Sequence, residues 1–389
     1  MPSIVQWAKR AITSNPTVAG WAYQPYADYQ FRKRQKALAT RYAELLKEDP
    51  ILPAGSAFSI GHEPTLRCNL ACKMCYQADF REDEGTVNEL TTEQMIAVYE
   101  RVNVADAKLI GSEIFMRKDI FEVLDYLNKR QVKVSLMTNG TLLGEKAIER
   151  LRGYDNVEWV GFSIDGSEQV HNAIRGRSYA FGRTVEAIKG VRPYFTVSIN
   201  SVILKENLHD LTSILHLCKD LGIPFVHFIF EEAYSEADVR ITGEILNREM
   251  GWETSDYEVC TNVREDYEYS FQDLVDTVER LKAEGRRIGV FPVFSPDTWY
   301  YRLKDYYDGT ANRNNHLVCA KLITDTPTFR LDHMGDVHHC GVIRHSFGNL
   351  LEQSPEEIWN SDEYRQYRRL LMDRRLLPIC KRCCKAACI

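Results

Sequence analysis

The chain has 389 residues, which is enough for a large hydrophobic core and about two domains. Its 44% hydrophobic and 27% charged residues are typical of a globular protein, and a net charge of −6 gives no reason to expect a nucleic acid as partner. No apolar run is long enough to span a membrane, and Lys9 and Arg10 are not followed by the apolar core of a signal peptide. We therefore expect a cytoplasmic protein without membrane attachment.

Residues 1–57 are rich in aromatic and basic side chains. The pattern from about 29 to 48 is helical, and Asp49 and Pro50 end it. We expect a helical N-terminal extension whose aromatic side chains pack on the main domain. The alternative is a surface helix that lies on a membrane or an anionic partner.

Residues 58–232 alternate strand and helix signals and are predicted to form one domain. The predicted strands cover residues 57–62, 107–110, 132–137, 157–164, 195–203 and 225–230. The predicted helices lie near residues 92–103, 118–130, 144–152, 179–190 and 207–220. A capping box from Thr91 to Gln94 opens the first helix. The alternation predicts an α/β fold with a parallel sheet and right-handed crossovers, but its period does not decide whether the sheet closes.

The polar motifs of this domain stand at the carboxyl ends of predicted strands, where parallel α/β folds and barrels build their sites. They are a group of cysteines at 68–75, Gly111-Ser112-Glu113, Thr138-Asn139-Gly140 and Ser163-Ile164-Asp165-Gly166. Residues 233–316 are less regular, and we assign them to the last part of the domain and a connecting region. A helix near 271–285 and a strand at 287–293 are expected there.

Eleven cysteines are distributed unevenly along the chain. Three lie between residues 68 and 75 and six between 319 and 388, whereas Cys218 and Cys260 stand alone. In a chain of this size without a signal peptide, clustered cysteines indicate metal ligands rather than disulfides. Residues 317–389 are thus expected to form a separate cysteine-rich unit, in which Gly335 turns a hairpin with arms at 329–331 and 337–339.

Cys68, Cys72 and Cys75 are spaced Cys-x3-Cys-x2-Cys and followed by Tyr76. Three thiolates can hold three irons of a cubane cluster and leave the fourth iron open, whereas a zinc site normally needs four ligands. This motif resembles the signature of the radical S-adenosylmethionine (SAM) superfamily. The resemblance implies a partial (β/α)6 barrel and a [4Fe–4S] cluster on the triad. It also implies SAM on the open iron, cleavage to a 5′-deoxyadenosyl radical, and an electron donor such as flavodoxin or ferredoxin.

The resemblance extends to candidate SAM contacts. Gly111, Ser112 and Glu113 match the Gly-Gly-Glu element that holds the methionyl amino group, although Ser112 replaces a glycine and Ile114 a proline. The other implied cofactor-binding residues are Tyr76, Thr138, Ser163, Arg175 and Asn200. Arg175 would bind the methionyl carboxylate. Two alternatives stay open: Arg175 as a surface arginine, and Asn200 as a strand residue at a bulge.

The C-terminal cysteines resemble those of the SPASM and twitch extensions, which carry auxiliary iron–sulfur clusters. A full SPASM unit has seven cysteines, whereas six are found here. We therefore expect one auxiliary [4Fe–4S] cluster, bound by Cys319, Cys340, Cys380 and Cys383. Cys388 or Cys384 is an alternative ligand. A zinc ribbon is the alternative for the whole unit.

The leading functional hypothesis is a radical SAM oxidoreductase, a dehydrogenase acting on a small polar metabolite such as a sugar or an aminocyclitol. Residues 1–57 lack the alternating strand pattern of a peptide-binding module, which favours a small-molecule substrate. The runner-up is a maturase or epimerase acting on a ribosomally made peptide, with Cys260 as a candidate catalytic hydrogen donor. The alternative of another class is a zinc-stabilised scaffold without catalysis.

Overall fold

The computed structural model describes residues 33–78, 88–259, 263, 266–296, 303–310 and 317–389. Cys260, the candidate hydrogen donor, lies outside the described residues. The N-terminal extension is described from residue 33 and is helical from 33 to 47, so its helix ends before Asp49 and Pro50 as predicted. No helix in the described part of the chain is both long and apolar enough to span a bilayer.

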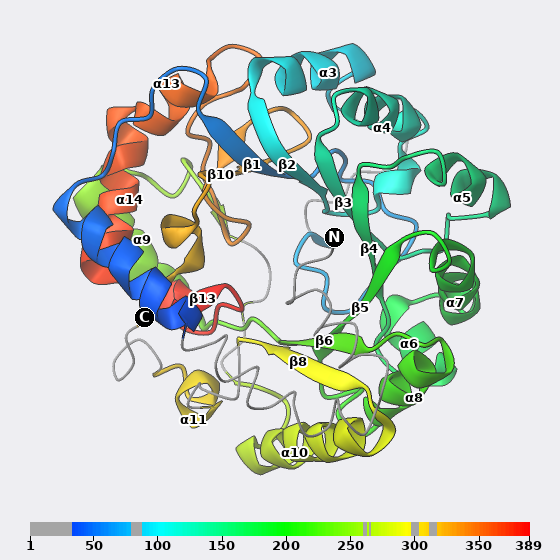
Figure 1. Cartoon of the computed structure of the whole chain (residues 1–389). Coiled ribbons are helices and arrows are strands. Elements are labelled where there is room, and N and C mark those ends of the chain that lie inside the picture. Colours follow the sequence, from blue (N-terminus) through cyan, green and yellow to red (C-terminus); the bar gives the residue numbers. More distant parts are fainter. Residues whose placement is uncertain (1–32, 79–87, 260–262, 264–265, 297–302, 311–316) are drawn as a thin grey trace.

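A nine-stranded sheet with the order β11-β10-β1-β2-β3-β4-β5-β6-β8 forms the centre of the fold. Its strands are β1 Ala57–His62, β2 Asn103–Leu109, β3 Lys133–Thr138, β4 Val157–Ser163, β5 Thr196–Ile203, β6 Phe225–Phe230, β8 Phe291–Ser295, β10 Thr328–Leu331 and β11 Val337–His338. All neighbouring pairs are parallel except β10 with β11. The sheet curves into a partial barrel with most helices on its outer side (Figure 1). The α/β class and the parallel sheet agree with the prediction.

The helices follow the strands in alternation. They are α3 Thr92–Arg101, α4 Ile120–Lys129, α5 Glu145–Leu151, α6 Glu168–Arg175, α7 Ala180–Val191, α8 Thr212–Asp220, α9 Glu236–Met250, α10 Phe271–Ile288, α11 Leu303–Tyr307, α13 Pro355–Asn360 and α14 Asp362–Arg374. The expected capping box opens α3. The Thr91 side chain accepts a hydrogen bond from the Gln94 backbone amide, and the Gln94 side chain accepts one from the Thr91 backbone amide. Helix α6 was not expected.

The strand predicted at 287–293 was wrong at its start. Helix α10 continues through Arg286 and Arg287 to Ile288, and Gly289 ends it in a left-handed conformation with φ 77°. The strand that follows, β8, pairs in parallel with β6. Two arginines in the last turn stabilise a helix through its dipole, and glycine takes the left-handed cap at no steric cost.

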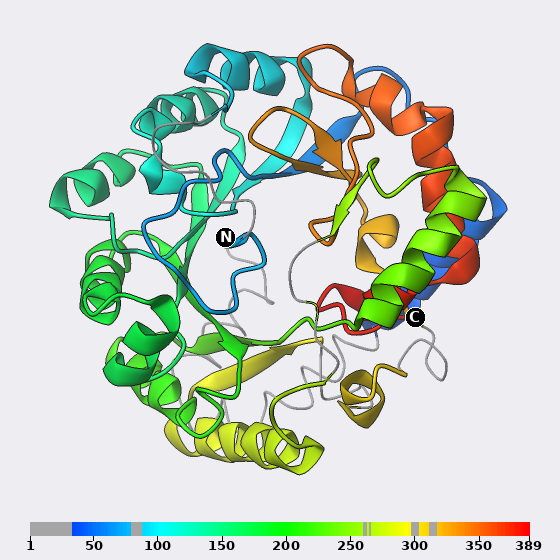
Figure 2. The same cartoon turned by 180° about the vertical axis from the view of Figure 1, so that it is seen from behind.

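Strand β10 was expected only as an arm of a hairpin, and it is one, because it pairs with β11. The same strand also adds in parallel to the free edge of β1, with Ser59 opposite Thr328. Figure 2 shows this hairpin beside β1 from behind. The C-terminal unit is thereby joined to the barrel by backbone hydrogen bonds.

Successive side chains along a strand alternate between two faces of the sheet, which lie in different environments. On β4, Val160 and Phe162 are fully buried and pack in the main hydrophobic core. Trp159 and Ser163 are only partly buried and occupy the other face. Because successive strand residues point to opposite sides, that other face is the barrel interior. The interior is therefore lined by a more polar set of side chains than the core under the helices.

The helix at 33–47 packs on α14. The Tyr42 hydroxyl donates to the Met372 carbonyl at 2.6 Å, and Arg368 pairs with Asp49 at 2.7 Å. The described part of the N-terminal extension thus covers the cysteine-rich C-terminal unit.

Candidate active site

The loop after β1 carries Cys68, Cys72 and Cys75, and the end of α6 holds it in place. The Ala71 amide donates to the Arg175 carbonyl at 3.2 Å, and the Lys73 amide donates to the Ile174 carbonyl at 3.0 Å. Gly176 caps α6 with φ 71°, and a Cβ there would lie 2.9 Å from the Ala71 carbonyl oxygen. Glycine is thus required both by the backbone angle and by the close approach of the loop.

Arg175 lies against the middle thiol of this triad. Its Nη1 donates to Cys72 Sγ at 3.5 Å, and its Nε donates to Asp165 Oδ2 at 2.5 Å. Asp165 is fully buried and its Oδ1 has no hydrogen-bond partner among the described residues. The predicted carboxylate-binding arginine therefore lies at the triad, in contact with the Cys72 sulfur.

Gly111, Ser112 and Glu113 follow β2 and face the same loop. Gly111 has φ 109°, and a Cβ there would lie 3.1 Å from Glu63 Cβ. The Ser112 hydroxyl donates to the Leu66 carbonyl at 3.1 Å and to Gln77 Oε1 at 3.2 Å. Since Ser112 bonds backbone next to the triad, the serine found in place of glycine has a structural role here.

The Glu113 carboxylate is fully buried. Among the described residues, the groups that donate hydrogen bonds to it are all neutral. It accepts from the Thr138 hydroxyl at 2.8 Å, the Asn139 amide at 2.7 Å and the Phe115 amide at 3.2 Å. Burial raises the pKa of Glu113 to about 7, although these hydrogen bonds oppose the shift. A cationic ligand such as an ammonium group would supply the missing counter-charge.

Ser163 and Asn200 lie directly opposite one another on β4 and β5, on the interior face. The Asn200 Oδ1 lies 3.2 Å from His227 Nδ1, and His227 Nε2 lies 2.6 Å from the Ser295 hydroxyl. Thr138 and Ser163 lie at the carboxyl ends of the neighbouring strands β3 and β4, and Asn200 lies within β5, opposite Ser163. His227 was missed, because a histidine within a strand carries no signal of its own.

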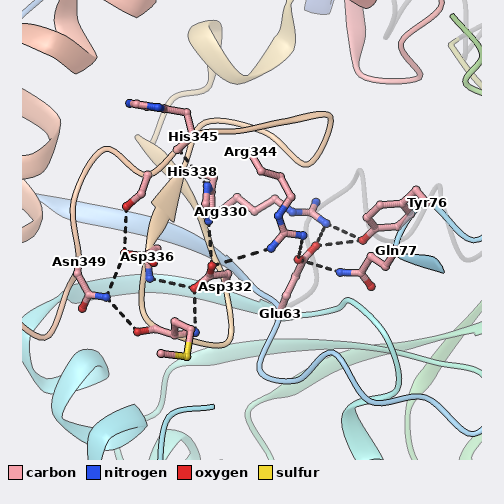
Figure 3. A network of polar contacts seen from close by, with 12 residues as sticks. Glu63, Tyr76, Gln77, Arg330, Asp332, Asp336, His338, Arg344, His345 and Asn349 are labelled. Atoms are coloured by element: carbon pink, nitrogen blue, oxygen red, sulfur yellow. Dashed lines mark hydrogen bonds and ion pairs between the residues drawn. The ribbon is translucent and has the colours of Figure 1, made fainter. Parts of the chain in front are cut away.

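Glu63 follows β1 directly and is fully buried. It forms ion pairs with Arg330 of β10 and, at 3.1 Å, with Arg344. The Tyr76 hydroxyl donates to Glu63 Oε1 at 3.0 Å, and Gln77 Nε2 donates to Glu63 Oε2 at 2.9 Å. Figure 3 shows these groups converging on one carboxylate. Tyr76, predicted as a SAM contact, therefore also connects the triad loop to the C-terminal unit.

The same network continues into the hairpin of the C-terminal unit. Asp332 Oδ2 lies 3.0 Å from His338 Nε2, and Oδ1 accepts from the Met334 and Asp336 amides at 2.8 and 3.0 Å. Nearby charged and hydrogen-bonding groups lower the pKa of Asp332 to about 2, with the His338 side chain as the largest of them. His338 is therefore a partner of Asp332 rather than of a metal.

A cavity of about 300 Å³ separates the triad loop from the C-terminal cysteines. Met74 and Tyr76 line it on the side of the triad. The cysteines that line it on the other side are Cys319, Cys340, Cys380, Cys383 and Cys384. The structure thus brings together the four predicted auxiliary ligands with Cys384. Cys388 lies on strand β13 (Ala386–Cys388) and pairs with Leu317 of strand β9 (Leu317–Cys319). Its side chain is not among those that the structure describes.

The thiols fit an iron–sulfur cluster by their surroundings. Burial raises the pKa of both Cys68 and Cys319 to about 11, so an adjacent cation is needed to keep these groups as thiolates. Backbone amides already point at two of the sulfurs: Ile343 N donates to Cys340 at 3.5 Å, and Lys385 N donates to Cys383 at 3.3 Å. Such N–H to sulfur bonds favour the thiolate form and tune cluster potentials.

Comparison with family models decides the class. Residues 62–218 match the radical SAM superfamily, and residues 325–384 match SPASM, an iron–sulfur cluster-binding domain. The chain contains a radical SAM domain followed by a SPASM domain. The first domain implies SAM and a [4Fe–4S] cluster, and the second implies auxiliary iron–sulfur clusters.

Curated relatives cover parts or most of the chain. The bacteriocin biosynthesis protein AlbA of Bacillus subtilis is 30% identical over 173 residues, 44% of this chain and 38% of AlbA. An AdoMet-dependent heme synthase of Methanosarcina barkeri is 35% identical over 176 residues, 44% of this chain and 50% of that protein. The mycofactocin maturase MftC of Mycobacterium tuberculosis is 26% identical over 314 residues, 79% of this chain and 71% of MftC. The matches to the first two span half or less of those proteins.

Among solved structures, SuiB of Streptococcus suis bound to its precursor peptide SuiA is similar in fold. The TM-score is 0.58 at 16% identity, and the match covers 84% of this chain and 69% of SuiB. At this identity the likeness describes the fold alone.

We expect Cys319→Ala to remove the auxiliary cluster and leave the triad cluster intact. Iron analysis after anaerobic reconstitution should fall by about four irons per chain. Cleavage of SAM should persist, because Cys68, Cys72 and Cys75 belong to a separate loop. If the iron content were unchanged, Cys319 would not be a ligand.

Proposed function

We propose that this radical SAM enzyme modifies a peptide substrate in the cavity between the triad loop and the SPASM domain. The observation that carries the proposal is that both domains line one cavity of about 300 Å³, with Met74 and Tyr76 facing the SPASM cysteines. A substrate held there would lie between the two places where iron–sulfur clusters would bind. AlbA and MftC, named for bacteriocin biosynthesis and for mycofactocin maturation, support a peptide over a sugar or aminocyclitol.

The residues of this chain would have the following roles in the reaction. The three triad thiolates would hold the cluster, and Arg175 would stabilise the charge on Cys72. Gly111 and Ser112 would position the SAM-binding loop, with Glu113 pairing with the methionyl ammonium. When bound, the cluster and SAM supply the electron and the 5′-deoxyadenosyl group from which the radical arises. Cys319, Cys340, Cys380 and Cys383 would hold the auxiliary cluster on the opposite wall.

The outcome of the reaction is also part of the proposal. An auxiliary cluster on the far wall of the cavity would accept the second electron of the substrate after hydrogen abstraction. This favours a net oxidation of the peptide, such as crosslinking or oxidative decarboxylation. A soluble reductant such as flavodoxin or ferredoxin would supply the first electron.

The test is hydrogen transfer into 5′-deoxyadenosine. The anaerobically reconstituted enzyme is incubated with SAM, a reductant and one class of perdeuterated substrate at a time: precursor peptides encoded beside the enzyme, iron porphyrins, or aminocyclitols. We expect deuterium in 5′-deoxyadenosine only with a peptide. Deuterium transfer from a porphyrin or an aminocyclitol, with none from a peptide, would overturn the proposal.

A further inference from the structure

Gln77 is a buried glutamine in the turn that follows the last triad cysteine. The Ala78 amide closes this turn by donating to the Cys75 carbonyl at 3.1 Å. Gln77 Nε2 donates to Glu63 Oε2 at 2.9 Å, a contact drawn in Figure 3, and Gln77 Oε1 lies 3.2 Å from the Ser112 hydroxyl. Gln77 thus joins the carboxylate between the two domains to the loop that follows β2.

The chemistry of its partners fixes which way the Gln77 amide points. Glu63 forms ion pairs with Arg330 and, at 3.1 Å, with Arg344, so its carboxylate oxygens can only accept hydrogen bonds. The NH2 group of Gln77 must therefore face Glu63, and the carbonyl oxygen of the same amide must face Ser112. Because a carbonyl oxygen can only accept, Ser112 is the donor in this contact.

The loop that contains Ser112 also packs directly on Glu63. Gly111 has φ 109°, and a Cβ there would lie 3.1 Å from the Glu63 Cβ, so the backbone comes as close as glycine allows. On the other side of Ser112, the Glu113 amide donates to the Arg67 carbonyl of the triad loop at 3.0 Å. Contacts thus hold the loop on both sides of Ser112, and the hydrogen bond from Ser112 to Gln77 fixes the residue between them.

We propose that Gln77 is a positioning residue for SAM, which acts by holding the loop 111–113 through Ser112. A glycine at position 112 would offer no side chain for such a bond, whereas the serine of this chain does. Because arginines of the SPASM domain hold Glu63, the geometry of the loop also depends on the docking of that domain. The proposal rests on the part of the proposed function that assigns this loop to SAM, and it does not depend on the substrate.

The test measures SAM binding to the anaerobically reconstituted holoenzyme. Equilibrium dialysis with radiolabelled SAM gives the Kd, and the triad cluster is kept oxidised so that SAM is not cleaved. The variants are Gln77→Met, Ser112→Gly and the double variant, since methionine keeps the length of glutamine without its amide. Gln366→Met is the matched control, because Gln366 is exposed on α14 and its Nε2 donates to the Glu249 carbonyl.

We expect Gln77→Met and Ser112→Gly each to raise the Kd for SAM about fivefold, as for the loss of one hydrogen bond, with Gln366→Met unchanged. If Gln77 acts through Ser112, the double variant should bind SAM no more weakly than the weaker single variant. A merely structural role would instead give effects that add in free energy, and this result would overturn the proposal. Binding of SAM by Gln77→Met as tight as that of wild type would also overturn it.

Iron and sulfide content of each variant checks that the clusters are intact. If Gln77→Met loses iron, Gln77→Asn replaces it in every arm, because asparagine keeps the amide but is too short to reach both partners. Glu113→Gln tests the loop assignment separately, since Glu113 is expected to pair with the methionyl ammonium. Weaker SAM binding by Glu113→Gln with unchanged binding by Gln77→Met would overturn the positioning role alone. Unchanged binding by both Glu113→Gln and Ser112→Gly would overturn the loop assignment as well.

Discussion

Replacing Cys72 by alanine is expected to abolish reductive cleavage of SAM. Cys72 is the triad thiol that Arg175 contacts at 3.5 Å, and without it two thiols remain for a cluster that needs three from this loop. We expect the iron content to fall by about four per chain and 5′-deoxyadenosine to disappear from assays with dithionite. Product analysis by chromatography and mass spectrometry measures the effect.

Cys218→Ala is the matched control for this prediction. Cys218 is a buried cysteine on α8 that packs in the hydrophobic core. Its replacement removes core volume and is expected to cost about 1 kcal/mol of stability while leaving iron content and cleavage unchanged. Continued formation of 5′-deoxyadenosine by Cys72→Ala would contradict the assignment of the triad.

Replacing Glu63 by alanine is expected to lower stability more than any surface substitution. Glu63 is fully buried between Arg330 and Arg344, with Tyr76 and Gln77 completing its hydrogen bonds. Removing one partner of a buried ion pair leaves the other charge uncompensated and costs about 3–5 kcal/mol. Because Arg330 lies on β10, the substitution should destabilise the pairing of the SPASM hairpin with β1. Thermal unfolding followed by circular dichroism should show a midpoint lower by roughly 4–6 °C.

Glu158→Ala is the control, because Glu158 forms an exposed ion pair with Lys133 that is worth less than about 1 kcal/mol. Glu63→Gln separates charge from shape, since glutamine keeps the size and one acceptor oxygen but removes the negative charge that faces Arg330 and Arg344. We expect Glu63→Gln to lose nearly as much stability as Glu63→Ala. A glutamine variant as stable as wild type would show that the hydrogen bonds, and not the charge, hold the two domains together.

Much of the fold was predictable from local pattern. The six strands of the first domain, its helices α3, α4, α5, α7 and α8 and the hairpin around Gly335 appear close to where the sequence signals put them. Capping residues and alternation act over a few positions, so they can be found without knowledge of the fold. The end of α10 was mispredicted because the helix runs on through Arg287 to the cap at Gly289.

The candidate site was predictable where its residues stand next to strand ends. The triad, Glu113, Thr138 and Ser163 all follow this rule, and the spacing of the three cysteines identified the superfamily. Glu63 also ends a strand, yet nothing near it in sequence marks it as a charge partner. Its arginines are more than 260 residues away, at positions 330 and 344. Contacts between residues so far apart in sequence depend on which strand pairs with the edge of β1.

The substrate class is where the first expectation and the relatives diverge. The pattern of residues 1–57 favoured a small polar metabolite, whereas the curated relatives include a bacteriocin biosynthesis protein, a mycofactocin maturase and AdoMet-dependent heme synthases. Substrate specificity depends on side chains from several strands that meet in the folded protein. Their spacing along the chain does not predict which of them will meet.

The sequence by itself predicted a cluster with an open iron and a second set of cysteine ligands, because thiols at fixed short spacing limit which metal centre can form. It also predicted most strands and helices of the first domain, since both depend on near-neighbour residues. Only the tertiary structure decided that β10 pairs with β1 and that Met74 and Tyr76 of the triad loop face the SPASM cysteines across one cavity. It also decided that Glu63 joins two arginines. These are contacts between distant segments, and they form only when the barrel has brought the strand ends together.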